Sequence, residues 1–146
     1  MESGFRGLRV YQLSHQLALK VHAMTMSLPK FEVYEEGGQI RRSSKRVSSS
    51  IVEGYCLRKH KAEYLQYLHR AHGSAEETIE HLDFLHETGS LPDTKLYEEL
   101  RTGYEALSRQ LYRFVQGVDH EHDVPYAFQE AEESYGAEDP PACDAP

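Results

Sequence analysis

The fold class is decided by residues 92–118, which read PDTKLYEELRTGYEALSRQLYRFVQGV. Apolar or small residues recur here at steps of three or four, the spacing that places side chains on one face of an α-helix. That face comprises Leu96, Leu100, Gly103, Leu107, Leu111, Phe114 and Val118. Pro92 stands where the first turn of a helix tolerates proline. The stretch therefore predicts a long amphipathic helix.

Two further segments show the same spacing and end at helix breakers. Residues 7–28 stop before Pro29, because proline disfavours the α conformation of the residue that precedes it. Residues 61–87 are followed by Gly89, which stands where a left-handed residue ends a helix. The two apolar stripes are Val10, Leu13, Leu17, Val21, Met24 and Leu28, and Tyr64, Leu68, Ala71, Ala75, Ile79, Leu82 and Leu85. Both segments are predicted helices.

A fourth helix is predicted over residues 39–58, after a connection at residues 30–38. Its apolar stripe is thin, and the positions between are small: Ser43, Ser44, Ser48, Ser49, Ser50 and Gly54. Serine is a mediocre helix former, so this helix needs neighbours that pack closely against its small residues.

These four helices predict an all-α fold, an antiparallel up-and-down four-helix bundle. The connections between the second, third and fourth helices are short, which makes consecutive helices antiparallel neighbours. The whole chain has 146 residues, enough for one domain with its own core. We expect this domain to span residues 1–118.

The net charge of −8 is unevenly distributed along the chain. Residues 119–146 contain nine of the 24 acidic residues and no Lys or Arg, which leaves fifteen acids against 16 bases in residues 1–118. Residues 119–146 also lack a helical period and contain four prolines, so they predict a disordered acidic tail. The negative total therefore does not exclude contact between the bundle and nucleic acid.

Basic residues cluster in and after the second predicted helix. They are Arg41, Arg42, Lys45, Arg46, Arg58, Lys59 and Lys61. At about 100° per residue the first four span an arc of roughly 140° on the side away from the apolar stripe. Such a face can bind phosphates. The alternative, which is commoner for four bases on one helix, is that these residues pair with acids of neighbouring helices or subunits.

Within this helix, residues 39–54 read QIRRSSKRVSSSIVEG and resemble the signature of the "four helix bundle protein" family. The founding members of that family are encoded by intervening sequences in bacterial large-subunit ribosomal RNA genes. Further matches are residues 5–12, Leu28-Pro29 and residues 71–77, so the resemblance covers about residues 5–118. The chain departs from the signature at three positions, where Arg46, Ser50 and Val52 replace Ser, Asn and Ala.

The resemblance implies a homo-oligomer, a pentamer, without enzymatic activity and with a role in nucleic-acid biology. A related branch supplies the accessory protein of diversity-generating retroelements, which binds a reverse transcriptase and RNA. We therefore expect a non-catalytic scaffold whose basic helix face engages RNA or a reverse-transcriptase-like partner. The alternative is an adaptor that binds only proteins.

The signature residues Gln39, Glu53, Gly54, Gly73 and Ser74 are expected to be structural. Glu53 is expected to pair with Arg41, Arg42 or a counterpart on another helix, because no second acid or nucleophile is spaced to work with it. The two glycines are expected to let helices approach closely. No catalytic residue is predicted. Five of the ten tyrosines, at positions 64, 67, 97, 104 and 112, are expected to straddle the core and its rim, with the ring buried and the hydroxyl hydrated, rather than to form a base-stacking platform.

No metal or cofactor is predicted. His69, His72 and Glu76 share a helix face, but they lack the paired motifs of zinc or di-iron sites. The acidic tail is expected to lie against the basic face and compete with phosphate. Without a leader sequence or an apolar run of roughly 20 residues, we expect a soluble cytoplasmic protein with no membrane contact.

Overall fold

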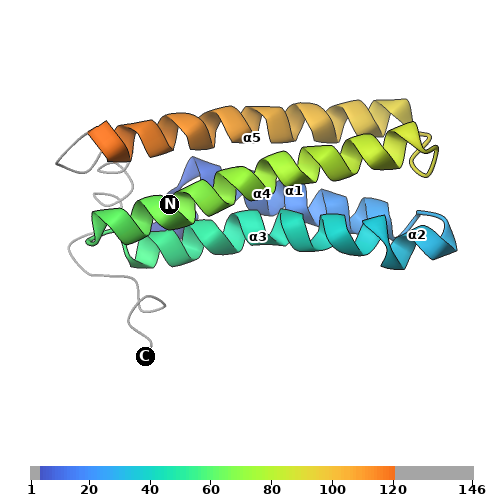
Figure 1. Ribbon diagram of the computed structural model, residues 1–146. Helices are drawn as coiled ribbons and strands as arrows, with labels where there is room; N and C mark the ends of the chain where they lie inside the picture. Colours follow the sequence, from blue (N-terminus) through green and yellow to red (C-terminus); the bar gives the residue numbers. More distant parts are fainter. Residues whose placement is uncertain (1–3, 121–146) are drawn as a thin grey trace.

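The computed structural model describes residues 4–120, and all secondary structure in this range is helical (Figure 1). The 3₁₀ helix η1 (Gly4–Gly7) is followed by α1 (Arg9–Thr25), α2 (Lys30–Tyr34), α3 (Glu36–Cys56), α4 (Lys61–Glu87) and α5 (Thr94–His120). The four long helices α1, α3, α4 and α5 lie side by side and alternate in direction. The predicted antiparallel four-helix bundle is confirmed.

The long helices form a ring in which each packs against two neighbours. Helix α3 contacts α1 and α4, and α5 contacts α4 and α1, so α3 and α5 are diagonally opposite. The predicted stripes fill the interior, and fully burying one such leucine stabilises the fold by about 1.5–3 kcal/mol. The largest fully buried side chains are Tyr55, Tyr104, Ile40, Ile51, Leu68, Leu82, Leu85, Leu100, Leu107, Leu111 and Val21.

Helices α3 and α4 approach closely along the small residues of α3. Ser43 and Gly54 are buried there, and a Cβ atom on Gly54 would lie 3.0 Å from Cβ of Tyr67. The Ser43 and Thr78 hydroxyl oxygens are 2.8 Å apart, within hydrogen-bonding distance. The close packing expected from the serine-rich sequence is therefore present, and it compensates for the low helix propensity of serine.

The largest departure from expectation is α2, a five-residue helix inside the predicted connection. Pro29 starts it, because its carbonyl accepts bonds from the amides of Glu32 and Val33. The backbone then breaks at Glu35, with φ −93° and ψ −102°, and α3 begins at Glu36 instead of near residue 39. A Cβ atom on Gly37 would lie only 2.7 Å from the Glu32 carbonyl oxygen, so a residue without a side chain is needed at this corner.

The ends of α4 and α5 follow local signals. Helix α4 has the predicted limits, and Gly89 adopts the expected positive φ of 83° just after it. Helix α5 begins at Thr94 rather than at Pro92, because the Asp93 carboxylate accepts a hydrogen bond from the Leu96 amide at 3.1 Å and caps the helix. It continues to His120, so the expected boundary at residue 118 falls in its last turn. The predicted tail otherwise lies outside the described residues.

Candidate nucleic-acid interface

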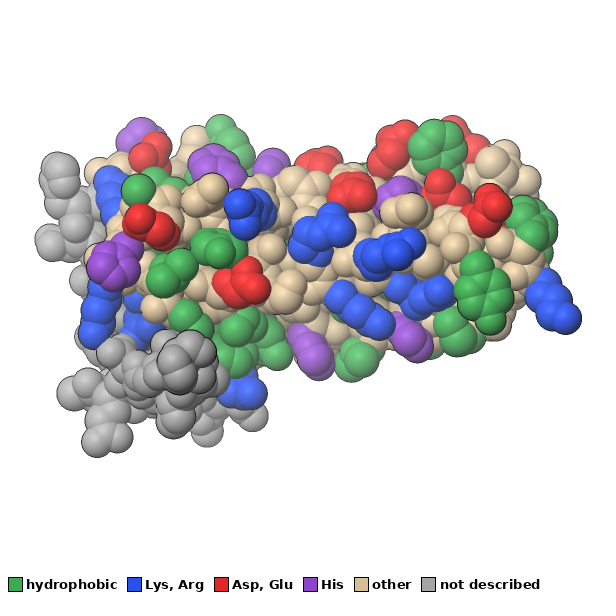
Figure 2. Space-filling view, turned by 60° about the horizontal axis from the view of Figure 1, so that its bottom comes forward, with side chains coloured by type: hydrophobic (Ala, Val, Ile, Leu, Met, Phe, Trp, Pro, Cys, Tyr) green, Lys and Arg blue, Asp and Glu red, His purple; other side chains and the backbone are tan. Residues whose placement is uncertain are grey.

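Arg42 and Lys45 form the accessible centre of the basic region on α3. Both side chains are exposed, and among residues 4–120 neither forms a side-chain hydrogen bond or an ion pair. Figure 2 turns the lower side of Figure 1 forward and shows Lys and Arg side chains gathered across the middle of this face and towards the α2 end. These cations are available to a phosphate backbone.

Arg46 has a partner on the neighbouring helix. Its Nη1 lies 3.2 Å from Oε2 of Glu77, and about half of each side chain is exposed. An exposed pair of this kind contributes at most about 1 kcal/mol, so a phosphate can replace the carboxylate at low cost. Arg46 therefore pairs with an acid of a neighbouring helix, as the alternative interpretation expects. Arg42 and Lys45 have no such partner within residues 4–120.

Arg41 does not share the outward face that the helical spacing predicted. Its side chain is half-buried, and Nη2 donates a hydrogen bond to the Val33 carbonyl oxygen at 2.7 Å. That carbonyl lies near the end of α2, where unpaired carbonyl groups favour a cation. The prediction was wrong for this residue, because α2 was not foreseen and its last turn provides Arg41 with an acceptor.

The three later bases lie at the opposite end of α3 and do not extend the face. Arg42 and Arg58 are separated by roughly 24 Å along the helix at about 1.5 Å per residue. Arg58 stacks over the Tyr55 ring, with the guanidinium carbon 4.2 Å from its centroid, and also donates to the Tyr55 carbonyl oxygen at 3.0 Å. Lys61 donates to the Asp119 carbonyl oxygen at 2.8 Å, and Lys59 is exposed nearby in sequence.

The signature residues differ in their surroundings. Gly54 and Ser74 are buried between helices, whereas Gln39 and Glu53 are exposed. Within residues 4–120 Glu53 forms no ion pair, so its expected bond to Arg41, Arg42 or a residue of another helix in the chain is absent. Gly73 is also exposed, and a Cβ atom there would have no neighbour within 4 Å. The expectation that Gly73 lets two helices approach was wrong, because it lies on the solvent side of α4.

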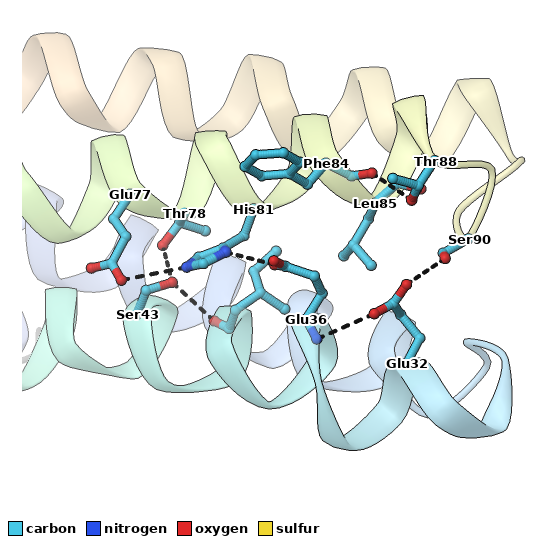
Figure 3. A network of polar contacts seen from close by, with 11 residues as sticks. Glu32, Glu36, Ser43, Glu77, Thr78, His81, Phe84, Leu85, Thr88 and Ser90 are labelled. Atoms are coloured by element: carbon cyan, nitrogen blue, oxygen red, sulfur yellow. Dashed lines mark hydrogen bonds and ion pairs between the residues drawn. The ribbon is translucent and has the colours of Figure 1, made fainter.

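A buried carboxylate that sequence reasoning missed fixes the junction of α2 and α3. Oε2 of Glu32 accepts a hydrogen bond from the Ser90 hydroxyl at 2.6 Å, and Oε1 accepts one from the Glu36 amide at 3.3 Å (Figure 3). The first contact ties α2 to the loop between α4 and α5, and the second caps α3. The available signal was an acid between two apolar residues, three positions after Pro29.

The same polar network continues along α3 and α4. His81 lies between two carboxylates, with Nδ1 2.6 Å from Glu36 and Nε2 3.4 Å from Glu77 (Figure 3). Glu77 is also the partner of Arg46, so hydrogen bonds and ion pairs link the capped end of α3 to the basic face. This network positions the helix that carries Arg42 and Lys45.

A serine, a histidine and a glutamate meet between α4 and α5, but not in a catalytic arrangement. The Ser108 hydroxyl contacts both His72 Nε2, at 3.1 Å, and the Glu76 carboxylate. In a catalytic triad the histidine stands between the serine and the acid, whereas here the serine is in the middle. His69 is exposed, and the described residues contain no group of three or more His, Cys, Asp or Glu placed to hold a metal ion.

None of the helices within residues 4–120 is long and apolar enough to cross a membrane.

Comparison with known proteins identifies the family. A search of curated proteins found no match. The family model described as "23S rRNA-intervening sequence protein" matches residues 6–113, which include all of α1 to α4 and most of α5. This is not a known enzyme family. The match covers most of the chain, including the serine-rich helix and its basic face, and the chain therefore belongs to the 23S rRNA-intervening sequence protein family.

Proposed function

We propose that the protein is a non-catalytic scaffold that binds RNA through the exposed face of α3, with Arg42 and Lys45 as the phosphate contacts. The observation that carries this proposal is the absence, within the described residues, of any acidic partner for these two exposed cations. Membership of a family named after a ribosomal RNA sequence supports RNA as the ligand.

The physical basis is the exchange of counterions for protein cations. Lys and Arg that contact phosphates release the condensed cations of the nucleic acid, and this release favours binding at low salt. Arg46 joins the site when phosphate replaces Glu77, since that exposed pair is weak. Arg41 contributes indirectly, because its bond to Val33 holds α2 beside the face.

The experiment compares two matched double variants of the full chain in a gel-shift assay at low salt with a structured RNA. Arg42→Gln/Lys45→Gln removes two cations from α3. Arg109→Gln/Arg113→Gln removes two exposed cations, likewise without an ion pair in the described residues, from the diagonally opposite helix α5. The α3 variant is expected to weaken binding at least tenfold, and the α5 variant much less. Equal losses, or no binding by the unsubstituted protein, would overturn the proposal.

We also propose that the protein assembles as a closed homo-oligomer, a pentamer, which repeats the basic face around a ring. Repetition raises affinity for a long RNA, because the second contact becomes intramolecular. Light scattering coupled to size exclusion is expected to give five times the chain mass of 16.8 kDa. A mass of one or two chains would contradict the assembly but leave the RNA site open to the gel-shift test.

A second candidate is a protein-binding adaptor, favoured by the exposed apolar side chains of Met26 and Phe31 near α2. These are 54% and 66% exposed. A pulldown from nuclease-treated lysate distinguishes the two functions. A specific protein partner that is retained by the Arg42→Gln/Lys45→Gln variant, together with no RNA affinity, would favour the adaptor.

A further inference from the structure

A shallow depression lies beside the basic face, at the junction of α2 and α3. It is lined by Tyr34, Gly38, Arg41, Arg42 and Lys45. Tyr34 is 81% exposed, more than any other large hydrophobic side chain among the described residues. An exposed aromatic ring beside cations offers the two surfaces that a nucleotide requires, a flat face for the base and positive charge for the phosphate.

Gly38 keeps the floor of the depression bare. A Cβ atom on this residue would lie 3.5 Å from Nη2 of Arg42 and 3.9 Å from Nη2 of Arg41. Both guanidinium groups therefore stand over backbone rather than over a side chain. The absence of a side chain at position 38 leaves room for both cationic groups at the surface of the depression.

The helix that carries Tyr34 is held in place before any ligand arrives. Helix α2 is tied to the loop after α4 through Glu32 and Ser90, and to α3 through the bond from Arg41 to Val33. Val33 is half-buried, so the helix presents Phe31 and Tyr34, three residues apart, to solvent. Stacking on Tyr34 therefore has to order its side chain but not the helix that carries it, which limits the conformational entropy lost on binding.

We infer that this depression binds an unpaired nucleotide, with the base stacked on the Tyr34 ring and the phosphate held by Arg42 and Lys45. The inference rests on the proposed RNA function and adds a preference to it. In a duplex the faces of the bases are covered by their neighbours, so Tyr34 cannot stack on them, whereas loops and single strands expose these faces. The protein therefore prefers unpaired strands to duplexes of equal charge.

The first experiment measures affinity by fluorescence anisotropy for a single-stranded RNA and for a duplex with the same number of phosphates. Tyr34→Ala is expected to weaken single-strand binding by about 5- to 100-fold, the usual effect of removing a stacking platform, and to leave duplex binding unchanged. Tyr34→Phe keeps the ring and is expected to bind as the unsubstituted chain does. Tyr112→Ala removes an exposed tyrosine from α5 and is the matched control.

The second experiment uses the absence of tryptophan from the sequence. Tyr34→Trp introduces the single tryptophan of the chain at the platform, and a stacked base is expected to quench its fluorescence. Tyr112 is 54% exposed, and Tyr112→Trp serves as the reference. Single-stranded RNA is expected to quench the first variant and not the second. Single-stranded DNA in a parallel titration shows whether the platform distinguishes the two sugars.

The outcomes separate this inference from the proposed function. If Arg42→Gln/Lys45→Gln weakens binding while Tyr34→Ala affects single strand and duplex equally or not at all, RNA binding stands and the stacking site is refuted. If no RNA binds, both fail. If Tyr34→Ala instead reduces the mass of the assembly in light scattering, the exposed ring belongs to a subunit interface, which also refutes the stacking site.

Discussion

Gly54 and Gly73 show that a glycine within a helix does not by itself indicate a contact between helices. Both lie within predicted helices and both were expected at helix contacts, but only Gly54 is buried, against Tyr64 and Tyr67. Sequence spacing placed Gly54 correctly because it follows the stripe of Ile40, Val47 and Ile51. Gly73 falls between Ala71 and Ala75 of its own stripe, which places it on the solvent side.

These surroundings predict opposite effects of alanine. Gly54→Ala is expected to destabilise the protein by about 1–3 kcal/mol, because a Cβ atom 3.0 Å from Cβ of Tyr67 forces α3 and α4 apart. Gly73→Ala is expected to stabilise it by about 0.5–1 kcal/mol, because the helix gains a better helix former without a new contact. Urea unfolding followed by circular dichroism measures both. A destabilised Gly73→Ala variant would contradict the exposed position of that residue.

Individual side chains of the candidate site were predictable only in part. The helical spacing correctly places Arg42, Lys45 and Arg46 on the solvent side of α3. It misplaced Arg41 and did not single out Glu32 or Tyr34, because the roles of these three residues depend on α2. A five-residue helix is too short to show a period, so sequence spacing cannot reveal it.

At the scale of the element, long helices were the most predictable part of the molecule. Helix α4 has its predicted limits because a sustained apolar period and a terminating glycine agree. Helix α5 differs by two residues at each end, since Asp93 caps it more strongly than Pro92 starts it, and its last turn carries few apolar residues. Which exposed polar residues pair between helices was not predicted.

One such pairing, between α4 and α5, makes a testable contribution to stability. Asp83 accepts hydrogen bonds from Arg101 Nε at 2.9 Å and from the Tyr97 hydroxyl at 2.7 Å. The bond from Arg101, more than that from Tyr97, holds the pKa of the Asp83 carboxyl below its ordinary value of 3.8, although burial opposes the shift. The hydrogen bond that the Tyr97 hydroxyl donates to Asp83 raises the pKa of Tyr97.

Because the folded-state pKa of Asp83 is lowered, its stabilisation is present at neutral pH and is lost as pH falls from 3.8 through the lower folded-state value. Asp83→Asn is therefore expected to reduce the free energy of unfolding at pH 7, by no more than about 1 kcal/mol since the cluster is partly exposed. The gap between the two proteins should shrink at pH 3. Urea titrations at both pH values measure it, and an equal gap at both would contradict the assignment.

At the scale of the whole molecule, charge is segregated along the chain. Residues 121–146 contain eight acids and no Lys or Arg, whereas the bundle is nearly balanced. If this acidic segment competes with phosphate for the α3 face, a chain ending at His120 is expected to bind RNA more tightly than the full chain, and the difference should diminish at high salt. Circular dichroism checks that the shortened chain folds. Equal RNA affinities for the full and the shortened chain would contradict competition by the acidic segment.

The fold could be predicted from sequence because four helices, each with one apolar stripe, can bury those stripes together in only a few arrangements, such as a bundle. The interaction surface was only partly predictable, since its shape depends on the junction of α2 and α3. Buried Glu32, Gly37 and half-buried Arg41 form that junction. The family match covers residues 6–113 and thus most of the four helices that form the bundle.

The central claim, that Arg42 and Lys45 contact phosphates, is tested most directly by the dependence of RNA affinity on salt. The slope of log K against log salt concentration should be less steep for Arg42→Gln/Lys45→Gln than for the unsubstituted protein, by about 1.4 for single-stranded RNA if each cation releases its share of counterions. Identical slopes would show that neither side chain touches the phosphate backbone, and would contradict the proposed interface.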